Sequence, residues 1–142
     1  MGRVINPDSA GKQRTQLLRT VAEVLRHLGQ KQTMDDDAKD MVSLLVFCFR
    51  EIDEGIDVSA TAWEKRDYWM KADELREKWG WAGRMADSLT ALIFEERWAD
   101  LPAMMLRIFP YVNDIKITKM TRKESEWLGS HMRLIRERAP GT

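Results

Sequence analysis

The chain has 142 residues with 23 basic and 23 acidic side chains, so its formal net charge is zero. This length fits one domain, which buries enough surface to form a core without disulfides. A single Cys excludes a disulfide framework, and no run of about 18 apolar residues is present that would span a membrane. We therefore expect one soluble, cytoplasmic domain over residues 1–142, with no cofactor.

The neutral total hides an uneven distribution of charge along the chain. Residues 1–33 carry six basic and two acidic side chains, residues 34–60 carry two and eight, and the remainder carries 15 and 13. A chain with oppositely charged parts is suited to self-association or to a charged partner.

A first helix is predicted from about Ala10 to Leu28, after a flexible N-terminal arm over residues 1–9. Gly29 is a suitable end, because glycine readily adopts the left-handed conformation that terminates many helices. The apolar side chains of this helix recur at helical spacing and form one face: Leu17, Leu18, Val21, Val24, Leu25 and Leu28.

The most apolar stretch of the chain is residues 41–49, MVSLLVFCF, in which only Ser43 is polar. Neither a helical nor a strand period leaves a polar stripe here, so the segment should be covered on most sides. It predicts the middle of a central helix over about residues 34–55, with Cys48 as a buried thiol. Thr33 is the expected cap at its start.

The segment 61–93 predicts two helices. A capping box at residues 61–64 marks the start of the first helix. Gly80 and Gly83 weaken the backbone near Trp81, so we expect a turn or kink there before the second helix, which continues to about residue 93.

The last third of the chain predicts two more helices and a connector. A short helix over residues 103–109 ends at Pro110. Residues 111–120 alternate apolar and polar side chains, which predicts an extended connector or a strand for the edge of a partner. A capping box at residues 121–124 starts the last helix, which runs to about Ala139 before a frayed end at residues 140–142. The elements together predict an all-α bundle of five or six helices around the central helix.

Four aspartates gather at the start of the central helix: Asp35, Asp36, Asp37 and Asp40. Asp36 and Asp37 each share a helix face with Asp40, and carboxylates are ligands that Mg²⁺ prefers. The fragment DDAKDMVSLLVFC resembles one half of the metal-binding pattern of the all-α nucleotide pyrophosphohydrolases. The resemblance implies a metal-dependent nucleotide hydrolase, for which the first helix supplies only Glu23. We interpret the aspartates as stabilising the helix dipole, and keep the hydrolase as a third hypothesis.

Two segments, 3–19 and 116–123, are rich in basic residues. If the fold brings them together, they form a cationic patch that neutralises several phosphates. A nucleic-acid-associated protein is therefore our second hypothesis. The candidate contacts are Arg3, Lys12, Arg14, Lys116, Lys119, Arg122 and Lys123.

Six tryptophans are many for a chain of this length. Trp63, Trp69, Met70 and Trp81 lie among charged residues, a composition typical of partner-facing surfaces. The other interpretation is that these side chains close the core of the bundle. Because the sequence has no convincing catalytic motif, we lean away from an enzyme. Our leading hypothesis is a helical protein–protein interaction module, as a homodimer, with these four residues in the interface.

Overall fold

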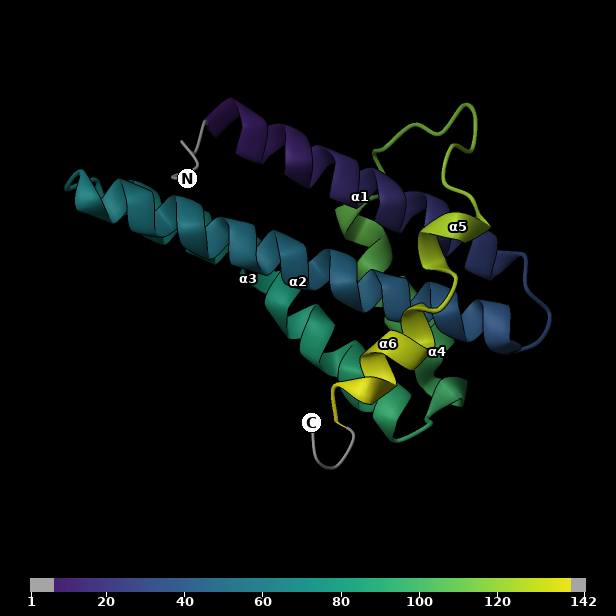
Figure 1. Ribbon diagram of the computed structural model, residues 1–142. Helices are drawn as coiled ribbons and strands as arrows, with labels where there is room; N and C mark the ends of the chain where they lie inside the picture. Colours follow the sequence, from purple (N-terminus) through teal and green to yellow (C-terminus); the bar gives the residue numbers. More distant parts are fainter. Residues whose placement is uncertain (1–6, 139–142) are drawn as a thin grey trace.

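The computed structural model describes residues 7–138, with side chains from residue 10 onward. Within these residues the regular secondary structure is entirely helical, which confirms the predicted all-α bundle. None of the helices in this part of the chain has the length and hydrophobicity needed to cross a membrane. The elements (Figure 1) are α1 (Pro7–Gly29), α2 (Asp36–Lys65), α3 (Trp69–Phe94), η1 (Trp98–Asp100), α4 (Leu101–Ile108), η2 (Phe109–Tyr111), α5 (Glu124–Trp127) and α6 (Ser130–Arg136).

The helix α2 is the centre of the bundle, as predicted. α1, α3, α5 and α6 all pack against it, and Figure 1 shows it between α1 and α6. Within residues 41–49 all side chains are buried except those of Leu44 and Phe47, which are half-buried. The polar Ser43 is buried as well. Its hydroxyl donates a hydrogen bond of 2.8 Å to the carbonyl oxygen of Lys39, so it is buried with a partner.

Both ends of α2 differ from the prediction. Asp35 rather than Thr33 caps the helix, since its side chain accepts a hydrogen bond of 2.8 Å from the backbone N–H of Ala38. The helix continues past Gly55 to Lys65. Ile56, which follows that glycine, is buried. Packing of this kind outweighs the low helix propensity of one glycine.

The turn between α2 and α3 lies at Arg66–Tyr68, so the predicted helix start at residues 61–64 is wrong. The backbone N–H groups of Arg66 and Tyr68 both donate to the carbonyl oxygen of Trp63, each at 3.0 Å. Asp67 adopts φ 63°, a left-handed conformation that Asp tolerates better than most residues. No glycine or proline marks this turn in the sequence.

One continuous helix, α3, replaces the two helices predicted between residues 61 and 93. It passes through Gly80 and Gly83 without a break. A Cβ atom on Gly83 would lie 2.7 Å from Oδ1 of Asp53 on α2. This glycine therefore permits the close approach of α3 to α2, rather than a turn.

In the C-terminal third, α4 (Leu101–Ile108) lies close to the short helix predicted over residues 103–109, whereas the predicted last helix is broken. Pro110 lies inside η2, and among the described residues 112–123 no strand forms. Gly129 adopts φ 84° and divides the predicted last helix into α5 and α6. Leu128, at this break, is 68% exposed.

The predicted arm covered residues 1–9, but α1 already begins at Pro7, so residues 7–9 are helical instead. Residues 1–6 of that arm and the frayed end at residues 140–142 lie outside the described residues.

Candidate functional site

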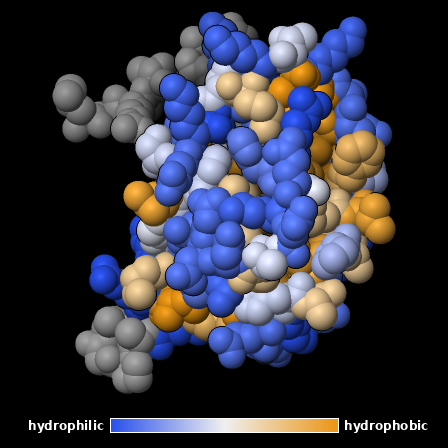
Figure 2. Space-filling view, turned by 90° about the vertical axis from the view of Figure 1, so that its right-hand side faces the viewer, coloured by the Kyte–Doolittle hydropathy of each residue, from blue (hydrophilic) through white to orange (hydrophobic). Residues whose placement is uncertain are grey.

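The acidic start of α2 is held by donors from the protein itself. Lys31 lies 2.7 Å from Asp37 and 3.1 Å from Asp35. Hydrogen bonds from the backbone N–H of Ala38 and from Lys31 lower the pKa of Asp35, and those from Lys31 and Trp127 lower the pKa of Asp37. Figure 2 looks onto this end of the molecule, where the facing surface is largely hydrophilic and hydrophobic side chains gather along the right-hand edge.

Two of these aspartates also fix the C-terminal helices. The indole N–H of Trp127 donates a hydrogen bond of 2.7 Å to Asp37. Asp40 accepts hydrogen bonds from the backbone N–H groups of Gly129 (3.1 Å) and His131 (2.9 Å), and so caps the first turn of α6. Among the described residues, no group of three or more His, Cys, Asp and Glu side chains converges in a way that could hold a metal ion.

Glu23, the acid that the hydrolase hypothesis required on the first helix, is fully buried. It is bound by the segment between η2 and α5 (residues 112–123), which we call the connector from here on. It accepts hydrogen bonds from the backbone N–H of Thr121 (2.6 Å), the backbone N–H of Arg122 (2.8 Å) and Nε of Arg19 (2.7 Å). Burial opposes its ionisation, but these donors prevail and lower its pKa to about 2. The geometry is that of a structural clasp between α1 and the connector.

The fold brings residues 116–123 alongside α1, where Arg19 is the basic residue of segment 3–19 that contacts them. Arg19 donates to the carbonyl oxygens of Lys116 (3.1 Å) and Lys119 (2.8 Å). Arg122 donates to the side chain of Thr20 and to the backbone and side chain of Gln16. Both guanidinium groups are therefore engaged within the protein.

The lysines of the two basic segments point outward instead. The exposed ones are Lys12, Lys116, Lys119 and Lys123. Arg14 lies apart from them, half-buried among α1, α2 and α3, and Arg3 lies outside the described residues.

The predicted interface residues fall in two places. Trp69 and Met70 begin α3 and are 57% and 78% exposed, and the neighbouring Tyr68 is 50% exposed. Trp63 is half-buried beside them, with its ring edge-on to Tyr68 at a centroid distance of 5.6 Å. We call Tyr68, Trp69 and Met70 the hairpin tip.

Trp81 does not belong to this surface. It is buried, stacks on Tyr111 at a centroid distance of 3.9 Å, and contacts Phe49 edge-on. It therefore joins η2 to the core of the α2–α3 pair, which is the second interpretation that the sequence left open for the tryptophans.

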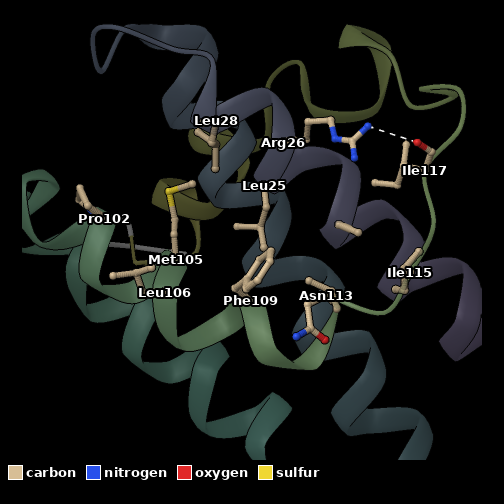
Figure 3. A pocket seen from close by; sticks show the side chains of 13 residues that line it. Leu25, Arg26, Leu28, Pro102, Met105, Leu106, Phe109, Asn113, Ile115 and Ile117 are labelled. Atoms are coloured by element: carbon tan, nitrogen blue, oxygen red, sulfur yellow. Dashed lines mark hydrogen bonds between the residues drawn. The ribbon is translucent and has the colours of Figure 1, made fainter.

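A groove of about 730 Å³ lies between α1 and the α4–η2 segment (Figure 3). In Figure 3 Leu25 of α1 and Phe109 of η2 point toward one another, whereas Pro102 and Leu106 lie further out and point away from α1. Each side contributes residues at i, i+3, i+4 and i+7, the spacing of one helix face. On α1 these are Ala22, Leu25, Arg26 and Gly29, and on the other side they are Pro102, Met105, Leu106 and Phe109.

The floor of the groove is buried, but one wall is open to solvent. Leu28 and Val112, which line it, are 6% and 4% exposed, whereas Leu106 and Phe109 are 75% and 55% exposed. An apolar helix stripe normally packs against a core. Exposed apolar surface next to a preformed groove is typical of an interaction site.

The charge of the groove has one sign. Of the residues that the structure describes, Arg26 is the single charged one that lines it, and its Nη1 donates one long hydrogen bond, of 3.3 Å, to the carbonyl oxygen of Ile117 (Figure 3). The exposed Lys116 lies between Ile115 and Ile117, which also line the groove. An acidic group would find a complementary charge at this end.

Sequence reasoning missed this groove. The spacing of Pro102, Met105, Leu106 and Phe109 is visible in the sequence, and a count of helical positions would have detected the stripe. The position of α1 opposite the stripe depends on contacts between residues far apart in the chain, and no local pattern reports it.

No protein-family model, no curated protein and no solved structure matches this chain. The surfaces described above are therefore the basis of the functional proposal.

Proposed function

We propose that this protein is a protein–protein interaction module whose groove between α1 and α4–η2 binds an amphipathic helix of a partner. The observation that supports it is the pair of helical stripes on the two sides of an open groove, with Leu106 and Phe109 exposed on one side. A third helix with its own apolar stripe would complete the packing, as in other helix-in-groove complexes.

The partner helix carries acidic residues beside its apolar stripe. Arg26 and Lys116 supply positive charge at one end, and no acidic residue of the described part of the chain lines the groove. A small apolar molecule is the less suitable occupant, because such ligands bury most of their surface in an enclosed pocket. Leu106, at 75% exposure, lies where only a larger partner would cover it.

Synthetic amphipathic helices of about 15 residues, roughly four turns, test this proposal. One peptide carries glutamates beside its apolar stripe, and its matched peptide carries lysines at the same positions. We expect the acidic peptide to bind more tightly in fluorescence anisotropy, and its NMR shift changes to map to residues 22–29 and 102–117.

Leu106→Glu is the decisive variant because Leu106 is exposed, so the change leaves the core intact. Leu128→Glu is the matched control, since Leu128 is 68% exposed and lies outside the groove. We expect Leu106→Glu to weaken binding at least tenfold, about 1.4 kcal/mol, and Leu128→Glu to leave it unchanged. Equal binding by the two variants, or shift changes elsewhere, would refute the groove as the binding site.

We further propose that the module self-associates as a homodimer through the hairpin tip. Its exposed Trp69 and Met70 are residue types enriched in interfaces, and they lie together at the start of α3. We expect the protein to act in the cytoplasm, and fractionation of cells that express a tagged copy tests that location.

Nucleic-acid binding is a second candidate function, favoured by the position of residues 116–123 beside α1. Because Arg19 and Arg122 donate within the protein, such binding would depend on the exposed lysines. With about four phosphate contacts, the affinity for duplex DNA should fall with a log–log salt slope of about −3 to −4. Absence of binding in fluorescence anisotropy at low salt would remove this candidate.

A further inference from the structure

A second cavity, of about 190 Å³, lies between the first turns of α1, the last turns of α2 and the start of α3. Arg14 comes from α1, Ser59 and Trp63 come from α2, Arg66 comes from the turn that follows, and Leu75 comes from α3. Among the residues whose side chains the structure describes, the lining therefore includes two guanidinium groups and no acidic residue.

Arg14 is incompletely paired in this position. Its Nη1 is buried and has no hydrogen-bond partner among the described residues. Its guanidinium carbon lies 5.5 Å from the ring centroid of Trp79, and burial lowers the pKa of the side chain. A guanidinium stays charged in proteins, and a buried donor without a partner is destabilising. An anion in the cavity would remove that penalty.

The nearest acid on the last turn of α2 does not supply this anion. Glu64 pairs with Arg76 of α3 through two hydrogen bonds, each of 2.9 Å. This bidentate pair satisfies its carboxylate and leaves the charge of Arg14 and Arg66 uncompensated within the cavity lining.

We propose that this cavity binds a phosphate group, held between the guanidinium groups of Arg14 and Arg66. Two guanidinium groups match the charge of a phosphate dianion, and their fork of donors suits its oxygens. Ser59 offers a hydroxyl donor in the same lining. Trp63 and Leu75 provide an apolar wall for the rest of a phosphorylated small molecule.

Calorimetry on the full chain tests the proposal with two probes, inorganic phosphate and AMP, and with acetate as a singly charged control. We expect both phosphate probes to bind and acetate to bind at least tenfold more weakly. Equal affinity for the two probes would identify free phosphate as the natural ligand. Tighter binding of AMP would identify a phosphate carried by a larger molecule.

Arg14→Gln and Arg66→Gln should each weaken phosphate binding at least tenfold, because each removes one charged fork. Lys12→Gln is the matched control, since Lys12 is an exposed cation of α1 outside the cavity lining. Arg66 is exposed, so Arg66→Gln decides the matter if Arg14→Gln fails to fold, which circular dichroism would reveal. Absence of heat with both probes at millimolar concentration would overturn the proposal, as would equal affinity in Arg66→Gln and Lys12→Gln.

Discussion

Glu23 of α1 accepts a hydrogen bond of 2.6 Å from the backbone N–H of Thr121, which lies 98 positions later in the chain. The hydroxyl of the same threonine donates to the other carboxylate oxygen at 2.9 Å. Glu23 is thus the buried side chain among those that join the connector to α1; Arg19, Arg26 and Arg122 add hydrogen bonds nearer the surface.

Replacing Glu23 with Gln should destabilise the protein by about 2–4 kcal/mol. The substitution keeps the shape of the side chain, but it removes the charge and turns one amide donor toward donors that need an acceptor. Urea denaturation followed by circular dichroism measures the effect. Glu126→Gln is the control because Glu126 is exposed on α5, and it should change stability by less than about 0.5 kcal/mol. Equal midpoints for the two variants would contradict the clasp.

The pKa of Glu23 also predicts how stability depends on pH. Its carboxyl has a pKa of about 2 in the folded protein against 4.5 in the unfolded chain. A lowered folded-state pKa stabilises the protein above pH 4.5, and this contribution is lost as the pH falls from about 5 to about 2. The contribution is about 3 kcal/mol at neutral pH. The stability difference between wild type and Glu23→Gln should therefore shrink steadily over this range, and a constant difference would show that the carboxylate is not responsible.

Asp40→Ala should release α6 from α2. The side chain of Asp40 accepts the backbone N–H groups of Gly129 and His131, so its loss leaves the first turn of α6 without a cap. We expect a loss of about 1–2 kcal/mol and faster hydrogen exchange confined to residues 124–138. Asp36→Ala is the control, since Asp36 is exposed at the start of the same helix α2 and should change stability by only a few tenths of a kcal/mol. Unchanged exchange in α6 would exclude the capping role.

Gly55→Ala and Gly129→Ala should change stability in opposite directions. Gly55 lies inside α2 with open space where a Cβ atom would be, so Ala should stabilise the helix by about 0.5–1 kcal/mol. Gly129 also has open space, but its φ of 84° is unfavourable for Ala, so the change should destabilise by about 1–2 kcal/mol. Thermal denaturation distinguishes the two, and a stabilising Gly129→Ala would argue against the break between α5 and α6.

Trp69→Asp should convert a dimer into monomers if the hairpin tip is the self-association surface. A buried, unpaired carboxylate at the contact should weaken association by tenfold or more. Light scattering over a concentration series gives the mass. Met132→Asp is the matched control because Met132, like Trp69, is 57% exposed and lies away from the tip. A monomeric wild type, or an unchanged mass for Trp69→Asp, would refute the homodimer.

The composition of one stretch was enough to predict the architecture, but not the helix ends. The apolar residues 41–49 predicted a covered central helix because a segment without a polar stripe has to be buried. Gly55 and Gly83 misled the prediction of helix ends, because each glycine lies in a helix stabilised by packing with its partner helix. The turn at Asp67 carries no glycine or proline, so no local signal marks it.

The exposure of the candidate residues could be predicted only where it does not depend on contacts with distant parts of the chain. Trp69 and Met70 do lie on the surface, whereas Trp81 stacks on Tyr111, a residue 30 positions away that no spacing rule could pair with it. The Glu23 clasp and the groove share this origin in distant contacts. Thr121, predicted to cap a helix, instead binds Glu23 because the connector crosses α1 at that point.

The hydrogen bonds between Glu23 and Thr121 join two points 98 positions apart, and so close most of the chain into a non-covalent ring. The α2–α3 hairpin lies within this ring, whereas α5 and α6 follow it and α1 begins before it. Loss of the Glu23 contacts would leave the connector held to α1 more weakly, by the remaining hydrogen bonds of Arg19, Arg26 and Arg122, while the α2–α3 hairpin keeps its own interface. We expect a protease to cut first within residues 112–123, and the surviving fragment to contain both long helices of the hairpin.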